Sequence, residues 1–208
     1  MGILLGLVVL SAGITAAQQP GDPTGAAPDS VVYHLAPSSR LLVKTGKAGL
    51  FGFAGHSHDI QARAFDGRVV YYPGAPSSSH LEITVLTESL EVLTPPDTAE
   101  IRKVTAAMRD EVLRIAEYHE INLVSRQVTP TEDGFHIVGA LTLVGETRDV
   151  PMDVRVEIGP DTLQANSAFS IKQTDFGIKP YSGGPAGTVK VADRVRFDIQ
   201  AIAVRSPP

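Results

Sequence analysis

Alternation of apolar and polar residues dominates the chain from Val31 onward. Between residues 150 and 158 an apolar side chain occupies every second position, and the same period of two recurs in segments 81–85, 163–171 and 195–201. Such alternation places one face of a strand in an apolar interior and the other face in water. These segments are therefore predicted to be β-strands with one buried face.

Shorter strand-like runs lie between them, and turn-forming pairs separate the runs. Asp66-Gly67, Pro73-Gly74 and Asp133-Gly134 are pairs that favour tight turns. Strands at this spacing predict an all-β domain, either an antiparallel sandwich or a barrel of about 8–10 strands. The further runs are Val31–Leu35, Leu41–Thr45, Ile60–Phe65, Arg68–Tyr72, Ile121–Val128 and Phe135–Val144.

One segment has a helical period instead. Pro95 and Pro96 end the strand before it, and Asp97 with Glu100 three residues later predicts a capped helix N-terminus. Apolar residues then recur at spacings of three or four and form one stripe. A helix of this kind has to lay its stripe on an apolar surface, and we expect it to cover one end of a barrel. The stripe consists of Ile101, Val104, Met108, Val112 and Ile115.

The composition is that of an ordinary globular protein, with 43% hydrophobic and 20% charged residues in a chain of 208. A chain of this length is expected to form one domain and needs no disulfide to stabilise its core. The net charge of −5, with scattered Lys and Arg residues, argues against nucleic-acid binding, which needs a basic face. The absence of cysteine excludes thiol chemistry and thiolate metal sites.

The N-terminal segment predicts export. Residues 2–17 carry no charge, and the apolar run Ile3–Leu10 is followed by small residues. This pattern is typical of a signal peptide, here over residues 1–17, and the alternative is a retained anchor. Residues 18–30 contain three prolines and two glycines, which predicts a disordered linker. The barrel domain is then expected over residues 31–205, in a protein that is periplasmic or secreted.

Four motifs along this domain are similar to those of one family. They are the segment Glu100–Ser125, which contains Tyr118-His119-Glu120-Ile121, and the segments Gly139–Val150, Phe169–Ile178 and Val189–Val195. In this order they resemble the YceI-like family of polyisoprenoid-binding proteins, and the resemblance covers roughly residues 31–204, which is nearly all of the expected mature chain. Two residues depart from the family pattern: His119 stands where a proline is commoner, and Val144 stands where a histidine often follows the strand.

The resemblance implies an extended, lipocalin-like antiparallel barrel that holds a long isoprenoid chain in its apolar interior. It also implies a periplasmic or secreted binding protein with no catalytic residue and no cofactor other than the bound lipid. Transfer of each five-carbon isoprene unit out of water contributes on the order of 3–4 kcal/mol, so a few units suffice for binding. The ligand is expected to be an isoprenoid, a quinone-like molecule or another long-chain lipid.

Large apolar residues are expected to line the lipid tunnel. They are chosen from the alternating strand faces, from the helical stripe and from the turn at Phe176, because no family motif fixes them individually. The expected lipid-binding residues are Phe53, Val69, Leu81, Ile83, Val85, Met108, Met152, Val154, Phe169, Phe176 and Phe197.

A pair of histidines supplies the most distinctive polar chemistry. His56 and His58 stand two residues apart, so on a strand they face the same side. We expect them to donate hydrogen bonds to a polar lipid head group. The alternative is a small metal-binding β-barrel protein that uses both imidazoles. Two ligands fall short of the three or four that a metal site needs, so no metal is predicted.

Enzymatic motifs are missing from the sequence. It contains no Gly-x-Ser-x-Gly elbow, no P-loop and no dinucleotide-binding glycine pattern. In the Asp175-Phe176-Gly177 run, we expect the aspartate to cap a turn and the glycine to adopt an unusual backbone angle. The chain is therefore predicted to carry or sequester a lipid. A solid barrel acting as an adaptor, transient contact with a membrane, and a homodimer are left open.

Overall fold

The computed structural model describes residues 29–48, 57–93, 98–183 and 189–206. The strands are β1 (Val31–Leu35), β2 (Arg40–Ala48), β3 (Asp59–Ala62), β4 (Phe65–Tyr71), β5 (His80–Leu86), β6 (Leu90–Val92), β7 (Glu120–Thr131), β8 (Gly134–Leu143), β9 (Glu146–Ile158), β10 (Thr162–Lys172), β11 (Ser182–Gly183) and β12 (Val189–Arg205). The helical elements are η1 (Pro76–Ser78), η2 (Thr87–Ser89), α1 (Thr98–Ala107), η3 (Met108–Val112) and η4 (Gln173–Phe176). The predicted signal peptide and nearly all of the predicted linker lie outside the described residues.

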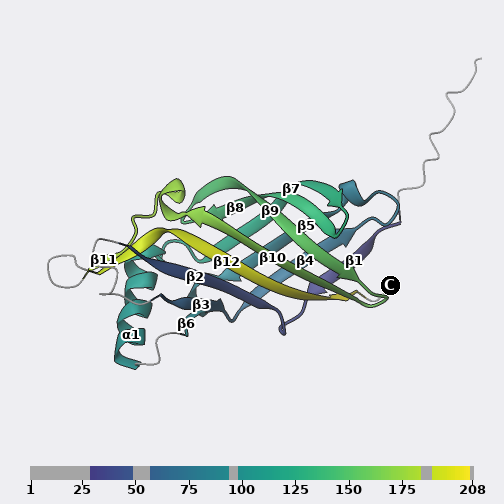
Figure 1. Cartoon of the computed structure of the whole chain (residues 1–208). Helices are drawn as coiled ribbons and strands as arrows, with labels where there is room; N and C mark the ends of the chain where they lie inside the picture. The colour runs from purple at the N-terminus through teal and green to yellow at the C-terminus, as the bar shows by residue number, and fades with distance from the viewer. Residues whose placement is uncertain (1–28, 49–56, 94–97, 184–188, 207–208) are drawn as a thin grey trace, which may run out of the picture.

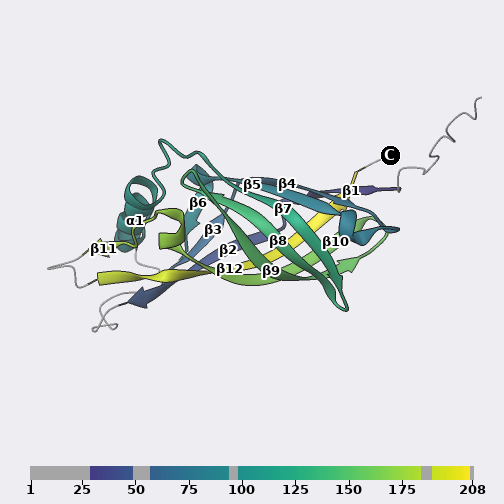
Figure 2. The same cartoon turned by 90° about the horizontal axis from the view of Figure 1, so that it is seen from above.

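The strands close into a single antiparallel barrel. Neighbours follow the order β1–β4–β5–β7–β8–β9–β10–β12, and the pairing of β1 with β12 completes the circle. The barrel is elongated, with α1 at one end and the C-terminus at the other (Figures 1 and 2). This confirms the predicted all-β, lipocalin-like barrel with one helical segment. None of the helices in the described ranges combines the length and the apolar character that a membrane crossing requires.

Three long strands of the barrel are interrupted near their middle. β12 pairs with β2 between Lys190 and Gln200, and with β1 between Ala203 and Arg205, so β1 and β2 together form one broken strand. β3 and β4 follow the same path beside them. At the first break the buried hydroxyl of Ser39 donates to the carbonyl of Ile202 and accepts from its amide, each at 3.0 Å. A side chain thus replaces the missing ladder bonds, which a buried backbone requires.

The interrupted strands leave one gap at the end of the barrel where α1 lies, which we call the helix end. β5 pairs with β7, but β6 continues beyond it, and within the described residues β6 pairs with β3 alone. The space beside β6 is covered by α1 and η3, because Met108 is buried there with Leu90 and Val92. The helical stripe therefore covers one end of the barrel, as expected.

The helix is shorter than its apolar stripe predicts. α1 ends at Ala107 and the chain continues as the π-helical turn η3. Arg114 then adopts a left-handed backbone with φ of 47°, so Ile115 lies beyond the helix. The period of the stripe persists through η3 because Val112 and Leu113 still pack on the core. Asp97, the expected capping residue, lies outside the described residues.

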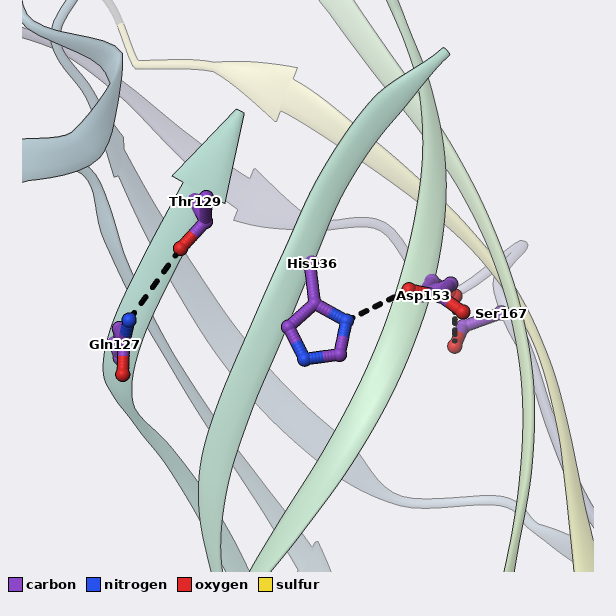
Figure 3. Close-up of polar contacts among 5 residues, drawn as sticks. All are labelled: Gln127, Thr129, His136, Asp153 and Ser167. Atoms are coloured by element: carbon purple, nitrogen blue, oxygen red, sulfur yellow. Dashed lines mark hydrogen bonds and ion pairs between the residues drawn. The ribbon is translucent and has the colours of Figure 1, made fainter. Parts of the chain in front are cut away.

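A second gap at the helix end separates β9 from β10. Their ladder covers only Val154–Ile158 and Leu163–Ser167, and both strands continue without pairing to each other. Where the ladder stops, the Ser167 hydroxyl donates to the carbonyl oxygen of Asp153 at 2.8 Å (Figure 3). The short helix η4 packs against both strands and fills the gap between them.

The turn containing η4 is held by a carboxylate from β12. Both the amide and the hydroxyl of Thr174 donate to Asp193, at 2.9 and 2.8 Å. Gly177 ends the turn with φ of 68°, in agreement with the prediction from sequence. The residue that holds the turn is therefore Asp193, where the sequence had suggested Asp175.

The opposite end of the barrel, which we call the closed end, is filled by side chains. Tyr33, Leu163 and Ala203 are buried there as one cluster. The rings of Tyr71 and Phe135 meet edge to face with centroids 6.4 Å apart. Large inward-facing residues thus seal the end of the barrel that lies away from α1.

Candidate functional site

A cavity of about 320 Å³ opens at the helix end. We call it the outer cavity. Its walls come from β2, β3, α1, η3 and the start of β12, together with the segment after η4. The lining residues are Val43, Thr45, His58, Ile60, Leu90, Lys103, Val104, Ala107, Met108, Val112, Leu113, Ile121, Leu143, Ile171, Gln173, Ile178, Tyr181, Lys190, Val191, Val195 and Phe197.

A second cavity of about 150 Å³ occupies the middle of the barrel. We call it the inner cavity, and its lining is almost entirely apolar. Its lining residues are Leu35, Leu41, Val43, Ile60, Ala62, Gly67, Arg68, Val69, Leu81, Ile83, Val85, Leu90, Ile121, Leu123, Leu141, Met152, Val154, Leu163, Ala165, Ser167, Phe169, Phe197, Ile199, Ala201 and Ala203.

The two cavities adjoin each other along the barrel axis. Both are lined by the same five residues, which form the boundary between them: Val43, Ile60, Leu90, Ile121 and Phe197. An apolar path therefore runs from the helix end inward and stops at the buried cluster of the closed end.

Small residues at inward-facing positions create the inner cavity. On β10 the inward row contains Ala165 and Ser167, and Ala201 faces Ala165 from β12. Gly67 adds a fourth small position, where a Cβ would meet Leu35 and Ile83 at 3.2–3.3 Å. Interiors without such positions are normally filled to close-packed density. The hollow is thus a consequence of side-chain size at positions that alternation had assigned to the interior.

Polar side chains are concentrated in the lining of the outer cavity. The hydroxyl of Thr45 accepts the amide of His58 at 3.1 Å and so ties β2 to the segment before β3. Gln173 is buried and donates from Nε2 to the carbonyl of Ala192 at 2.9 Å. The remaining polar lining residues are Lys103, Tyr181 and Lys190. This end of the path can therefore contact a polar group, whereas the inner cavity favours hydrocarbon.

Most of the residues expected from sequence to contact lipid lie along this path. Met108 lines the outer cavity and Phe197 lines both. Phe169 stacks on Phe197 with ring centroids 4.8 Å apart. Their contact with a lipid stays a prediction. The others that line the inner cavity are Val69, Leu81, Ile83, Val85, Met152 and Val154.

Phe176 is placed differently from the expectation. It is only 2% exposed, belongs to the buried cluster with Ile178 and Val195, and lines neither cavity. The physical reason is the divergence of β9 and β10, because the ring is needed to fill the wall between them. Phe53, which was also expected to contact lipid, lies outside the described residues.

His58 is the described member of the histidine pair. It is 7% exposed and lines the outer cavity, which is compatible with a head-group contact. His56 lies outside the described residues, so the pairing of the two imidazoles stays a prediction. In the described part of the chain, no group of three His, Asp or Glu side chains is arranged to hold a metal ion.

Several lining residues were missed by sequence reasoning. Val43, Ile60, Leu90 and Ile121 form the boundary between the cavities, and only their neighbour Phe197 was predicted. Three of these four belong to runs expected to be strands, and their size does not distinguish them from the valines and isoleucines that were predicted. Neither lining lysine carried a signal, since a charged residue is expected on the outer face of an amphipathic helix or an alternating strand.

Solved structures with a similar fold support this architecture. The crystal structure of Burkholderia cenocepacia BcnA aligns with a TM-score of 0.63 at 16% identity, covering 81% of this chain and 98% of that one. A polyisoprenoid binding domain from Saccharophagus degradans, implicated in plant cell wall breakdown, gives 0.60 at 13% identity, with 84% and 98% covered. The Campylobacter jejuni YCEI protein gives 0.55 at 15% identity, with 71% and 85% covered.

These identities are low, so the structural likeness establishes the fold and leaves the ligand open. The sequence itself matches a family model described as the YceI-like domain over residues 33–203, which is most of the chain. No curated protein sequence matches the chain.

Proposed function

This chain belongs to the family of YceI-like domains, and from that premise we propose that it binds a long apolar lipid inside its barrel and carries or sequesters it. The ligand is an isoprenoid or quinone-like molecule whose tail occupies the inner cavity. Support comes also from the Saccharophagus degradans structure of the same fold, which is described as a polyisoprenoid binding domain.

The observation that carries this proposal is the apolar path from the helix end to the closed end. An apolar path that ends at a buried cluster suits a chain that enters tail first. Its walls offer hydrocarbon contacts to the tail, and the polar side chains of the outer cavity remain near the entrance. Burial of the tail supplies the affinity, since apolar surface removed from water is the main favourable term.

The cavity volumes limit the length of the chain that fits this conformation. A dry apolar cavity of about 150 Å³ holds a ring of six carbons in a protein core. By that scale the inner cavity holds about one isoprene unit and the outer cavity about two. At roughly 3–4 kcal/mol for each unit, three units contribute on the order of 9–12 kcal/mol against association costs of roughly 4–15 kcal/mol. A longer chain would extend through the entrance or require the helix end to open.

The proposed place of action is the periplasm or the extracellular space. Residues 1–17 have the pattern of a signal peptide, and the domain that follows is a YceI-like barrel. We propose no catalysis. The sequence contains no Gly-x-Ser-x-Gly elbow, no P-loop and no dinucleotide-binding glycine pattern.

Native mass spectrometry of the full chain tests the proposal. The protein is expressed in a Gram-negative host with its own N-terminal segment, purified from the periplasmic fraction without detergent, and analysed together with an organic extract. We expect an added mass that the extract identifies as an apolar chain, and a mature N-terminus at Gln18. A folded protein that never carries lipid, or that carries a stoichiometric metal in its place, would contradict the proposed function.

A further inference from the structure

The charge of the cavity lining is opposite in sign to that of the whole protein. The chain has 23 acidic and 18 basic residues and a net charge of −5. Neither cavity is lined by a carboxylate, whereas the outer cavity is lined by Lys103 and Lys190. The charge of a lysine contributes nothing to the binding of an apolar tail. The positive charge of the outer-cavity lining therefore requires its own explanation.

The two lysines come from separate elements of the helix end. Lys103 lies on α1, which covers the gap beside β6, and Lys190 lies near the start of β12. Figure 1 shows α1 at the end of the barrel remote from the C-terminus, and the yellow β12 starts at that end and runs toward the C-terminus. Both side chains are exposed, and no carboxylate in the described ranges forms an ion pair with either ammonium group.

The neutral polar groups around them are already engaged in part. The Thr45 hydroxyl accepts the amide of His58, and the Gln173 amide nitrogen donates to the carbonyl of Ala192. The lysine ammonium groups each carry three donors and no acceptor. They are accordingly the strongest donors that this cavity offers to a ligand.

We propose that the lipid has an acidic head group, a carboxylate or a phosphate, which is bound between Lys103 and Lys190 while the tail occupies the two cavities. This inference rests on the proposed function, because it specifies the ligand class of the same site. A lysine lines a cavity with its apolar stem and keeps its charge at the wet rim. This is the arrangement that an amphiphile needs when its tail is buried and its head remains at the entrance.

Four ligands with the same fifteen-carbon tail test the inference by calorimetric titration: farnesyl phosphate, farnesoic acid, farnesol and farnesylamine. We expect at least one of the two acids to bind about tenfold more tightly than farnesol, the size of effect that charge-assisted hydrogen bonds produce. Farnesylamine is expected to bind most weakly. The preference for the acid should decrease as the salt concentration rises, because the lysines are exposed.

The double variant Lys103→Gln/Lys190→Gln should reduce the ratio between the Kd values of farnesol and the preferred acid to about one. A matched control is Lys172→Gln/Lys179→Gln, which removes the same charge from two exposed residues that line neither cavity. We expect this control to retain the preference for the acid. Preference for the phosphate alone or for the carboxylate alone identifies the head group and supports the inference in either case.

Two results would overturn the inference while the proposed function stands. One is equal affinity of the wild-type protein for farnesol and both acids. The other is a preference for acid that survives in the variant lacking both lysines. Failure of all four ligands to bind would instead contradict the proposed function itself, and the inference with it.

Discussion

The two ends of the barrel are built from the same alternating strands but have opposite interiors. At the closed end, the inward row contains Tyr33, Tyr71 and Phe135, and their rings fill the cross-section. Toward the middle, Ala165 and Ala201 occupy equivalent inward positions and leave a cavity. Alternation decides which residues face inward, and the size of each residue decides whether the interior is solid or hollow.

The wall of the barrel differs between the ends in the same way. At the closed end β9 and β10 are joined by a continuous ladder, and β1 seals against β12. At the helix end the wall has two gaps, which are covered by α1 with η3 and by η4. Backbone hydrogen bonds therefore close one end, whereas side-chain packing of helical segments closes the other. We therefore expect a ligand to enter at the helix end, where side-chain contacts have to separate but no ladder hydrogen bonds have to break.

The largest expected effect comes from filling the hollow region. Ala165→Phe places a ring in the inner cavity and displaces about one isoprene unit, which costs several hundredfold in affinity for farnesol. Ala168→Phe is the matched control, because Ala168 lies on the same strand and is exposed on the outer face. Calorimetric titration of both variants, with melting curves to verify folding, gives the comparison. Full affinity in a folded Ala165→Phe variant would mean that the tail binds elsewhere.

Emptying the solid region should affect stability more than binding. Tyr33 is 2% exposed at the closed end, and Tyr33→Ala is expected to lower the free energy of unfolding by about 3 kcal/mol through loss of a buried ring. His34→Ala, on the exposed face of the same strand, should change it by less than about 0.5 kcal/mol. Urea denaturation measures both. Equal effects of the two substitutions would contradict the solid packing of this end.

Much of this contrast could be predicted from the sequence, and some of it could not. The period of two predicted the strands, and the inward row Leu163, Ala165 and Phe169 follows it directly. No sequence pattern predicts the gap between β9 and β10, because a broken ladder depends on the twist and pairing of strands that are distant in the sequence. For this reason Phe176 was expected in the tunnel and is instead part of the wall.

Prediction of the candidate site from the sequence has the same limit. Residues such as Phe197 and Met152 were found because they are large and lie in phase with the pattern. Lys103 and Lys190 were not, because the helical stripe and the strand pattern both assign a lysine to the solvent side. Both lysines reach the cavity lining at the helix end, where α1 and the start of β12 border the outer cavity.

A tight turn at the helix end provides the next smaller effect. Val144 and Gly145 both have positive φ, 50° and 78°, between β8 and β9. A Cβ on Gly145 would lie 2.8 Å from the Tyr118 ring, so Gly145→Ala meets both backbone strain and a collision. We expect it to lower the free energy of unfolding by about 1–2 kcal/mol in urea denaturation. Gly74→Ala is the control, since nothing lies within 4 Å of a Cβ there. Equal losses in the two variants would contradict a special role for this turn.

Acid should weaken the turn that contains η4 before it affects the packing of the closed end. Hydrogen bonds from the amide and hydroxyl of Thr174 hold the pKa of the Asp193 carboxyl below its usual value. The carboxylate therefore adds stability above that usual value, and the contribution is lost as the pH falls through the lowered pKa. Urea midpoints between pH 6 and pH 3 should fall less steeply for Asp193→Asn than for wild type.

The control for this pH dependence is Asp175→Asn, which removes the same charge from the same turn without touching the contact to Thr174. The urea midpoint of Asp175→Asn should depend on pH in the same way as that of the wild-type protein. An Asp193→Asn profile that coincides with wild type throughout would show that the carboxylate does not hold the turn.

The smallest effect is expected on the outer face of the barrel wall. His136 and Asp153 form a contact of 2.7 Å between β8 and β9, near Gln127 and Thr129 of β7 (Figure 3). Both side chains are largely exposed, and such pairs contribute little. His136→Ala should change the free energy of unfolding by less than about 0.5 kcal/mol and leave farnesol affinity unaltered. A loss of more than about 1 kcal/mol in the free energy of unfolding would show that this outer face contributes to stability.

Methyl NMR of the protein with isotope-labelled isoleucines tests most directly whether the hollow region holds an apolar chain. Ile60 and Ile121 lie at the boundary of the two cavities and Ile83 lines the inner one, whereas Ile158 is exposed. On titration with farnesol, the account predicts that the first three methyl signals shift together and saturate at one equivalent while Ile158 stays in place. Shifts confined to Ile158 and other exposed methyl groups, with Ile60, Ile83 and Ile121 unmoved, would contradict it.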